Sequence, residues 1–152
     1  MDEIIFWMKA LCIITLLFWI CSISGYSQEK KDSKIIVTAS DTGNLFNRIV
    51  LSLYEKGYSL ENKDQELGFI STTEKPIPKT AGSMKVRAMI KESIITFTGL
   101  FAIDVEMKLF GTKLERTFDP VTFWGEKNGS YKICWREIEA IAKQFGNVTY
   151  SK

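Results

Sequence analysis

The stretch of sequence that decides the fold is residues 84–107, MKVRAMIKESIITFTGLFAIDVEM. In its first part, the apolar residues Met84, Val86, Ala88 and Ile90 alternate with a largely basic set. Successive side chains of a strand point to opposite faces, so a period of two places the apolar set on one face. This pattern predicts a half-buried strand of an antiparallel sheet.

The same period continues through the rest of this stretch. The apolar positions are Ile95, Phe97, Phe101, Ile103, Val105 and Met107. The other face carries Thr96, Thr98, Asp104 and Glu106. A turn at residues 92–93 therefore joins two long antiparallel strands. Gly99 interrupts the apolar face, which predicts a bulge or bend there.

Two other segments have apolar residues at helical spacing. The first follows Ser40-Asp41, which we expect to form its N-terminal cap, and Gly57 is expected to end it. The second runs from a capping Ser130 to Phe145. Its apolar positions are Tyr131, Cys134, Trp135, Ile138, Ile141, Ala142 and Phe145. Each pattern predicts an amphipathic helix with one face on a core.

Shorter segments complete the order of elements. Strands are predicted at residues 35–39, 58–63, 68–74 and 114–118, with a loop or sheet edge at 75–78 and a loop from 119 to 129. Two helices that each need an apolar surface are expected on the same face of one sheet. The sequence therefore predicts an α+β fold with a single curved antiparallel sheet and two helices on one face.

This order, with the Gly57-Tyr58 helix exit, the hairpin ending at residues 68–73 and the final helix, resembles the TBP-like β-α-β4-α fold. It is similar in particular to a family of small exported bacterial domains of that fold that has no assigned function. The resemblance covers residues 34–146 and implies an envelope or secreted domain. It transfers no functional residue to this chain, and the name of the fold implies no DNA binding.

The N-terminal segment has the layout of a secretory signal peptide. A basic Lys9, an apolar run and small residues at Gly25 and Ser27 predict cleavage after residue 27, with Met8 as a candidate true start. Two alternatives remain open, an uncleaved membrane anchor and a lipoprotein acylated at Cys21. We expect an exported protein, periplasmic or secreted, or otherwise a membrane-anchored one that faces the periplasm. Residues 28–33 are predicted to be a flexible tether, and residues 34–150 a single domain.

Composition excludes several kinds of chemistry. The 152-residue chain contains no histidine, which removes histidine-dependent triads, the zincin helix motif and the iron site of two histidines and one carboxylate. Cys134 is the one cysteine beyond the leader, so we expect no intrachain disulfide and interpret it as a packing thiol. The net charge of +2 comes from interspersed charges, which argues against nucleic-acid binding. We predict no catalytic, cofactor-binding or metal-binding residues and no cofactor.

One alternative function is a small carboxylate-dependent hydrolase. Asp104 and Glu106 are expected on the same face of a strand. The rise per residue of a strand places them about 6 to 7 Å apart. Paired carboxylates at such a separation can serve as acid and base, provided that a cleft surrounds them.

The favoured function is binding through the uncovered face of the sheet. Lys85, Arg87 and Lys91 are expected beside Thr96 and Thr98 on the adjoining strand, forming a basic, hydroxylated contact surface. Phe123 and Trp124 flank a loop, where they either close the edge of the core or form a candidate aromatic anchor for a partner. The sequence therefore predicts a non-enzymatic exported domain that binds a protein or envelope component. A membrane-anchored envelope scaffold is the other alternative, and it requires a retained N-terminal segment or a lipidated Cys21.

Overall fold

The computed structural model describes residues 28–152 except 30, 105–107, 110–111, 114–115 and 124–128. The elements are β1 (Lys34–Ala39), α2 (Leu45–Glu55), β2 (Leu60–Asp64), β3 (Phe69–Thr72), β4 (Lys75–Pro76), β5 (Gly82–Lys91), β6 (Ile94–Ile103), β7 (Lys108–Leu109), β8 (Thr112–Lys113), β9 (Asp119–Pro120), α3 (Ser130–Ala142) and β10 (Gly146–Ser151). The predicted leader, residues 1–27, lies outside the described residues.

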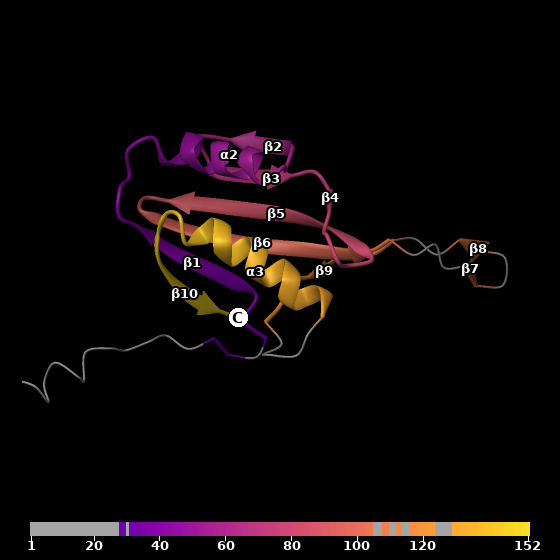
Figure 1. The fold of residues 1–152 in the computed structure, drawn as a ribbon. Helices are drawn as coiled ribbons and strands as arrows, with labels where there is room; N and C mark the ends of the chain where they lie inside the picture. Colours follow the sequence, from indigo (N-terminus) through magenta and orange to yellow (C-terminus); the bar gives the residue numbers. More distant parts are fainter. Residues whose placement is uncertain (1–27, 30, 105–107, 110–111, 114–115, 124–128) are drawn as a thin grey trace, which may run out of the picture.

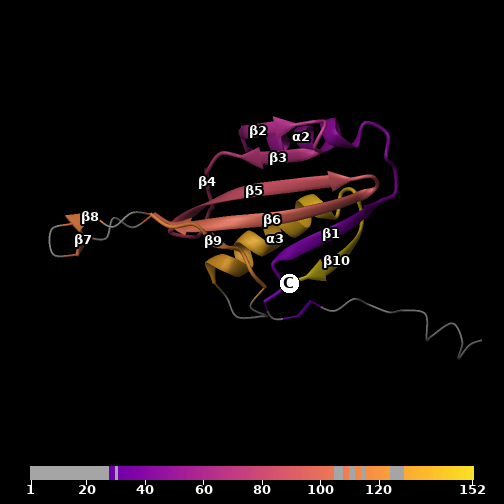
Figure 2. The same cartoon turned by 180° about the vertical axis from the view of Figure 1, so that it is seen from behind.

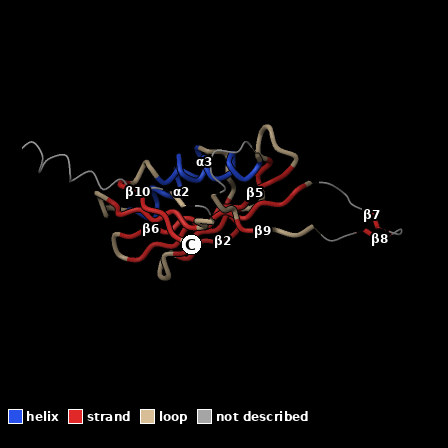
Figure 3. Tube along the Cα trace, turned by 90° about the horizontal axis from the view of Figure 1, so that it is seen from below, coloured by secondary structure: helices blue, strands red, loops and turns tan. Residues whose placement is uncertain are grey.

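One antiparallel sheet carries the fold. Its strands lie in the order β10-β1-β6-β5-β3-β2, while β4 extends the ladder beside β5 and β9 extends the ladder beside β6 (Figures 1 and 2). The strands β7 and β8 form a separate two-stranded sheet. Both helices lie over the same face of the main sheet, as the view from below shows (Figure 3). The predicted α+β class, with an unclosed antiparallel sheet and two helices, is confirmed.

The β5–β6 hairpin at the centre of the sheet forms as its alternating sequence predicts. The register runs without interruption from Gly82 opposite Ile103 to Lys91 opposite Ile94. The predicted apolar faces supply core residues on both strands: Met84, Val86, Ala88, Ile95, Phe97 and Phe101. Each large apolar side chain contributes about 1.5–3 kcal/mol by leaving water, so this hairpin provides a large share of the core.

Gly99 is not a bulge, contrary to the prediction. It lies in regular register opposite Val86. A Cβ at this position would clash with Ile138 Cδ1 and come within 3.0 Å of Val121 Cγ2. The glycine therefore allows helix α3 to approach the sheet closely, a packing requirement that strand periodicity does not reveal.

The helices bury the faces that the sequence predicts. Helix α2 turns Leu45, Ile49 and Leu53 into the core. Helix α3 buries Cys134, Trp135, Ile138, Ile141 and Ala142. Helical spacing placed these residues on one face because residues three and four apart are neighbours on a helix.

The predicted N-terminal caps are wrong. The residue before α2 is Asn44, with a left-handed φ of 52° and no side-chain capping bond. Asp41 instead accepts a hydrogen bond from Gly43 N at 2.8 Å and forms an ion pair with Arg48, so it stabilises the turn before the helix. Ser130 is the first residue of α3, and the residue before it, Gly129, has no side chain to cap the helix.

The predicted end of α2 is confirmed. Gly57 has a φ of 78°, in the left-handed region that favours glycine. Its backbone N–H donates to Tyr54 O at 2.8 Å, and Tyr58 N donates to Leu53 O at 3.0 Å. These bonds satisfy carbonyl groups of the last helical turn and direct the chain towards β2.

The chain after β6 also differs from the prediction. Of the strand predicted at 114–118, residues 114–115 lie outside the described part, and 116–118 are not in a strand. The short strand β9 forms instead within the predicted loop, where Leu100 faces Pro120. Strand β10 was not predicted. It follows α3 closely and pairs with β1 along its whole length, an interaction between the two ends of the domain.

The segment predicted as a flexible tether is hydrogen bonded to the domain. Lys31 N donates to Phe123 O at 2.8 Å, and Phe123 N donates to Asp32 O at 2.8 Å. Ser33 N donates to Ser151 O at 2.9 Å. Asp32 is buried, and its carboxylate accepts the backbone N–H of Glu29. Because the partners Phe123 and Ser151 lie far along the chain, local composition could not indicate them.

Candidate binding surface on the open face of the sheet

The face of the sheet opposite the helices has no described element over it (Figure 3). Its side chains are those that alternate with the buried positions of each strand. On β5 these are Lys85, Arg87, Met89 and Lys91, and on β6 they are Ile94, Thr96, Thr98 and Leu100. We refer to this surface as the open face.

The structure brings the five predicted contact residues together on the open face. Arg87 lies directly opposite Thr98 across the β5–β6 pair. Lys85 precedes Arg87 by two positions on β5, and Lys91 follows it by four. Thr96 lies between Thr98 and the turn on β6, opposite Met89. The alternation of two strands was therefore sufficient to place this set on one face.

The cations of this set differ in their surroundings. Lys85 Nζ lies 3.0 Å from Glu61 Oε1 and 5.4 Å from the centre of the Phe118 ring, so its charge is compensated. Arg87 and Lys91 are exposed and form no ion pair within the described part of the chain. The alternation of β5 could not predict that Glu61, on β2, would neutralise one of the three cations.

A largely apolar row of side chains crosses the open face, and the sequence does not predict it. The register places Ile36 opposite Thr96, Thr96 opposite Met89, and Met89 opposite Phe69. We call these four residues, Ile36, Thr96, Met89 and Phe69, the central row. Met89 is 47% exposed, as is Ile94 beside the row. Ile36 and Phe69 come from strands far apart in sequence, so no local pattern could assemble this row.

Phe123 packs against the core, as one of the two sequence-based alternatives predicts. It is half-buried, and its ring centre lies 5.9 Å from that of the buried Trp135. Its backbone bonds to residues 31 and 32 hold it at this position. Trp124, the other member of the predicted aromatic anchor, lies outside the described residues.

The carboxylate of Asp104 is held by neighbouring side chains. It accepts the hydroxyl of Ser83 at 2.7 Å and forms an ion pair with Arg116. Arg116 also pairs with Glu74. Glu106, which the alternative hydrolase function pairs with Asp104, lies outside the described residues. The arrangement around Asp104 is typical of an ion-pair network that connects strands at the end of a sheet.

Cys134 is fully buried on helix α3, as the sequence predicts. Burial, reinforced by the nearby charge of Glu137, raises the pKa of its thiol to about 12. The thiolate is the reactive form, so this cysteine is inert at neutral pH.

No group of three or more His, Cys, Asp or Glu side chains in the described ranges is arranged to hold a metal ion. Among the helices of that part of the chain, none has the length and apolar character to cross a membrane.

Comparison with known proteins adds no assignment to this geometry. The chain matches no protein-family model and no curated protein.

Proposed function

We propose that this protein is an exported, non-enzymatic binding domain that holds a protein of the bacterial envelope against the open face of its sheet. The proposal rests on the largely apolar central row, which lies on the open face. A solvated face of an antiparallel sheet normally has polar side chains, yet this one exposes about half of Met89 and about half of Ile94. Uncovered apolar side chains that cluster in this way mark interaction surfaces.

The charges around the central row indicate the chemistry of the partner. Arg87, Lys91 and, at the start of β1, Lys34 are exposed and form no ion pair among the described residues. Asp64 lies at the end of the row, where its carboxylate accepts Leu67 N at 2.9 Å. An acidic partner with apolar side chains would complement this surface in charge and in burial. The same cations are too few and too dispersed for a nucleic-acid or lipid-headgroup site.

The resemblance to the TBP-like β-α-β4-α family supports the proposed location. On this proposal, β2, β3, β5 and β6 correspond to the four central strands of that family, and β4, β7, β8 and β9 are additions. Members of such a family are exported, which agrees with the signal-like N-terminus. On this proposal, residues 1–27 direct export, and the domain acts in the periplasm or outside the cell.

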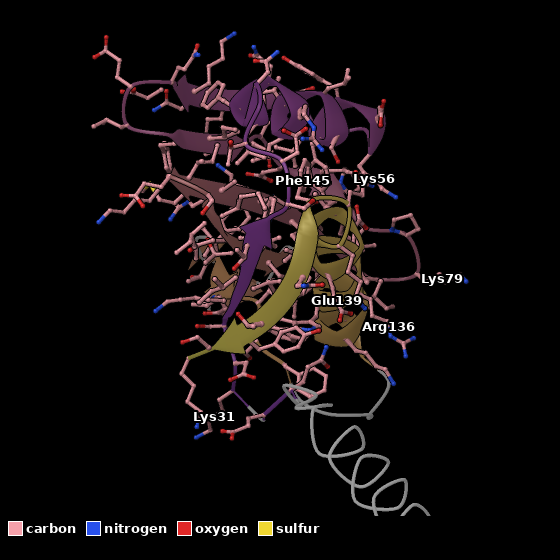
Figure 4. The ribbon with its side chains drawn as sticks, turned by 90° about the vertical axis from the view of Figure 1, so that its left-hand side faces the viewer. Lys31, Lys56, Lys79, Arg136, Glu139 and Phe145 are labelled. Atoms are coloured by element: carbon pink, nitrogen blue, oxygen red, sulfur yellow. The ribbon has the colours of Figure 1, made fainter. Side chains whose placement is uncertain are left out.

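The test is site-specific photo-crosslinking in cells that produce the protein naturally. A photoreactive residue replaces Met89 on the open face, and in a matched control it replaces Arg136 on the helix side of the molecule (Figure 4). We expect a discrete crosslinked protein from position 89 only. The double substitution Arg87→Glu and Lys91→Glu should remove that product, whereas Lys79→Glu with Arg136→Glu should not. Equal crosslinking after the open-face reversal would contradict the proposal.

A further inference from the structure

The two outer edges of the main sheet, β2 and β10, differ in how they are protected. An edge strand has unpaired backbone groups, and proteins usually blunt it with charges, proline or a bulge. Strand β2 has such devices, because it carries Glu61, Lys63 and Asp64 and its register shifts between Leu60 and Asn62. Pairing of a further strand with β2 is therefore disfavoured.

Strand β10 has none of these devices. Its six residues, GNVTYS, include no charged residue and no proline. It pairs with β1 in unbroken register from Gly146 opposite Ala39 to Ser151 opposite Lys34. It is the last strand of the sheet on this side, and it lies in front of β1 when the molecule is viewed from that side (Figure 4). Within the described ranges, the only backbone hydrogen bond between β10 and a segment other than β1 is the one that Ser151 O accepts from Ser33 N, next to the start of β1.

The side chains of β10 alternate between two surfaces. Val148 and Tyr150 lie on the helix side, half-buried. The Tyr150 hydroxyl bonds to Glu139 Oε1 at 2.6 Å, and its ring centre lies 6.0 Å from that of Trp135. These contacts fix the Tyr150 ring beside the edge of β10 that does not pair with β1. Asn147, Thr149 and Ser151 lie on the open face.

We propose that β10 pairs antiparallel with β10 of a second copy of this chain, about a twofold axis at Thr149. Residues directly opposite each other in an antiparallel pair have their side chains on the same face of the sheet. The twofold axis must therefore pass midway between the two copies of one residue. With Thr149 on the axis, Val148 faces Tyr150 of the other copy and Asn147 faces Ser151. Aromatic–β-branched and Thr–Thr pairs are favourable cross-strand neighbours. The alternative axis at Val148 would bring Gly146, with its φ of 155°, into the new ladder.

The strand is self-complementary, which favours a second copy over an unrelated peptide. An isologous contact uses the same residues twice, so like charges would often face each other across the axis. Because β10 has no charged side chain, its self-pairing avoids this repulsion. The product is a continuous sheet through both copies, and the open faces of the two copies lie on the same side of it.

The experiment is sedimentation equilibrium of the protein purified from cells that express the full gene, over roughly a thousandfold range of concentration. We expect a monomer–dimer equilibrium in the wild type. Thr149→Lys places two ammonium groups across the axis and should weaken dimerisation at least tenfold. Thr38→Lys is the matched control, because Thr38 is exposed on the open face of β1, which is an inner strand. A wild type that stays monomeric at every concentration overturns the proposal, as does a dimer that Thr149→Lys leaves intact.

A second variant keeps the test valid if Thr149→Lys fails to fold. Thr149 Oγ1 bonds to Ile36 O at 3.3 Å, a weak contact that cysteine can lose at little cost. Opposite residues in an antiparallel pair lie about 4.5–5.5 Å apart at Cα, which suits a disulfide. Thr149→Cys should therefore form a disulfide-linked dimer on mild oxidation, and Thr38→Cys should not. Equal crosslinking of both variants, or of neither, contradicts the proposed register.

Discussion

Lys75 Nζ lies 2.7 Å from Glu137 Oε1, and this ion pair connects the short strand β4 to the middle of helix α3. The same carboxylate oxygen accepts the hydroxyl of Tyr58 at 2.9 Å. Lys75 Nζ also donates to Lys56 O at 2.6 Å and lies 4.5 Å from the centre of the Tyr58 ring. Burial, with the adjacent Glu137 charge, raises the pKa of Tyr58 above its ordinary value, so Tyr58 remains a neutral donor.

Replacing Glu137 with leucine should destabilise the fold. The substitution leaves the ammonium of Lys75 and the buried hydroxyl of Tyr58 without their carboxylate acceptor. Loss of one partner of a partly buried charged pair costs about 2–3 kcal/mol. Urea unfolding measures this cost, and Arg136→Leu, which removes a charge from an exposed position of α3, is the control. Equal unfolding midpoints for the two variants would show that the network contributes nothing to stability.

Stability should fall at alkaline pH because of Cys134. Folding raises the pKa of this thiol from 9.0 to about 12, so above pH 9 the unfolded chain releases a proton that the folded protein retains. Stability then decreases as pH rises, by up to about 1.4 kcal/mol per unit, through the window between these two pKa values.

The effect of Cys134 is isolated by comparing pH slopes. Cys134→Ala removes the titrating group, and although it also leaves a small cavity, that cost does not depend on pH. Between about pH 8 and pH 10 the wild type should lose about 1 kcal/mol more than Cys134→Ala in urea unfolding. Identical losses would mean that folding does not raise the pKa of this thiol.

Adding a methyl group at Gly99 should loosen the packing of α3 on the sheet. The new Cβ would overlap Ile138 Cδ1, and such overpacking costs about 1–3 kcal/mol. Ile138→Val removes the overlapping methyl group, so Gly99→Ala with Ile138→Val should be more stable than the sum of the single changes predicts. Strict additivity in chemical denaturation would show that the contact does not limit the approach of the helix.

The elements that the sequence predicts well are those in which a regular apolar pattern repeats over many residues. The strands at residues 84–91 and 95–103 and both helices have alternating or helical patterns that depend on a single burying face. The five predicted surface residues follow from the same alternation. The α+β class could therefore be predicted without knowledge of any contact.

The features that the sequence could not predict depend on contacts between distant segments. Strand β10 has few apolar residues and is recognisable only because β1 lies beside it. The neutralisation of Lys85 requires Glu61, from a strand two positions away in the sheet. The central row joins Ile36 and Phe69 through the register of three strand pairs. The space that Gly99 leaves for α3 is likewise a tertiary feature.

Asp32 should contribute to stability although it precedes the first strand. It is 4% exposed, its carboxylate accepts Glu29 N at 2.8 Å, and its backbone oxygen accepts Phe123 N. Asp32→Ala removes a charged acceptor from a backbone donor, so we expect a loss of about 1–2 kcal/mol in the free energy of unfolding. Glu66→Ala, at an exposed hairpin position, should change stability by less than about 0.5 kcal/mol. Amide hydrogen exchange at Phe123 should accelerate in Asp32→Ala, because the bond from Phe123 N depends on the same segment. If both the stability and the exchange rate stay at their wild-type values, residues 28–33 act as the tether that their composition predicts.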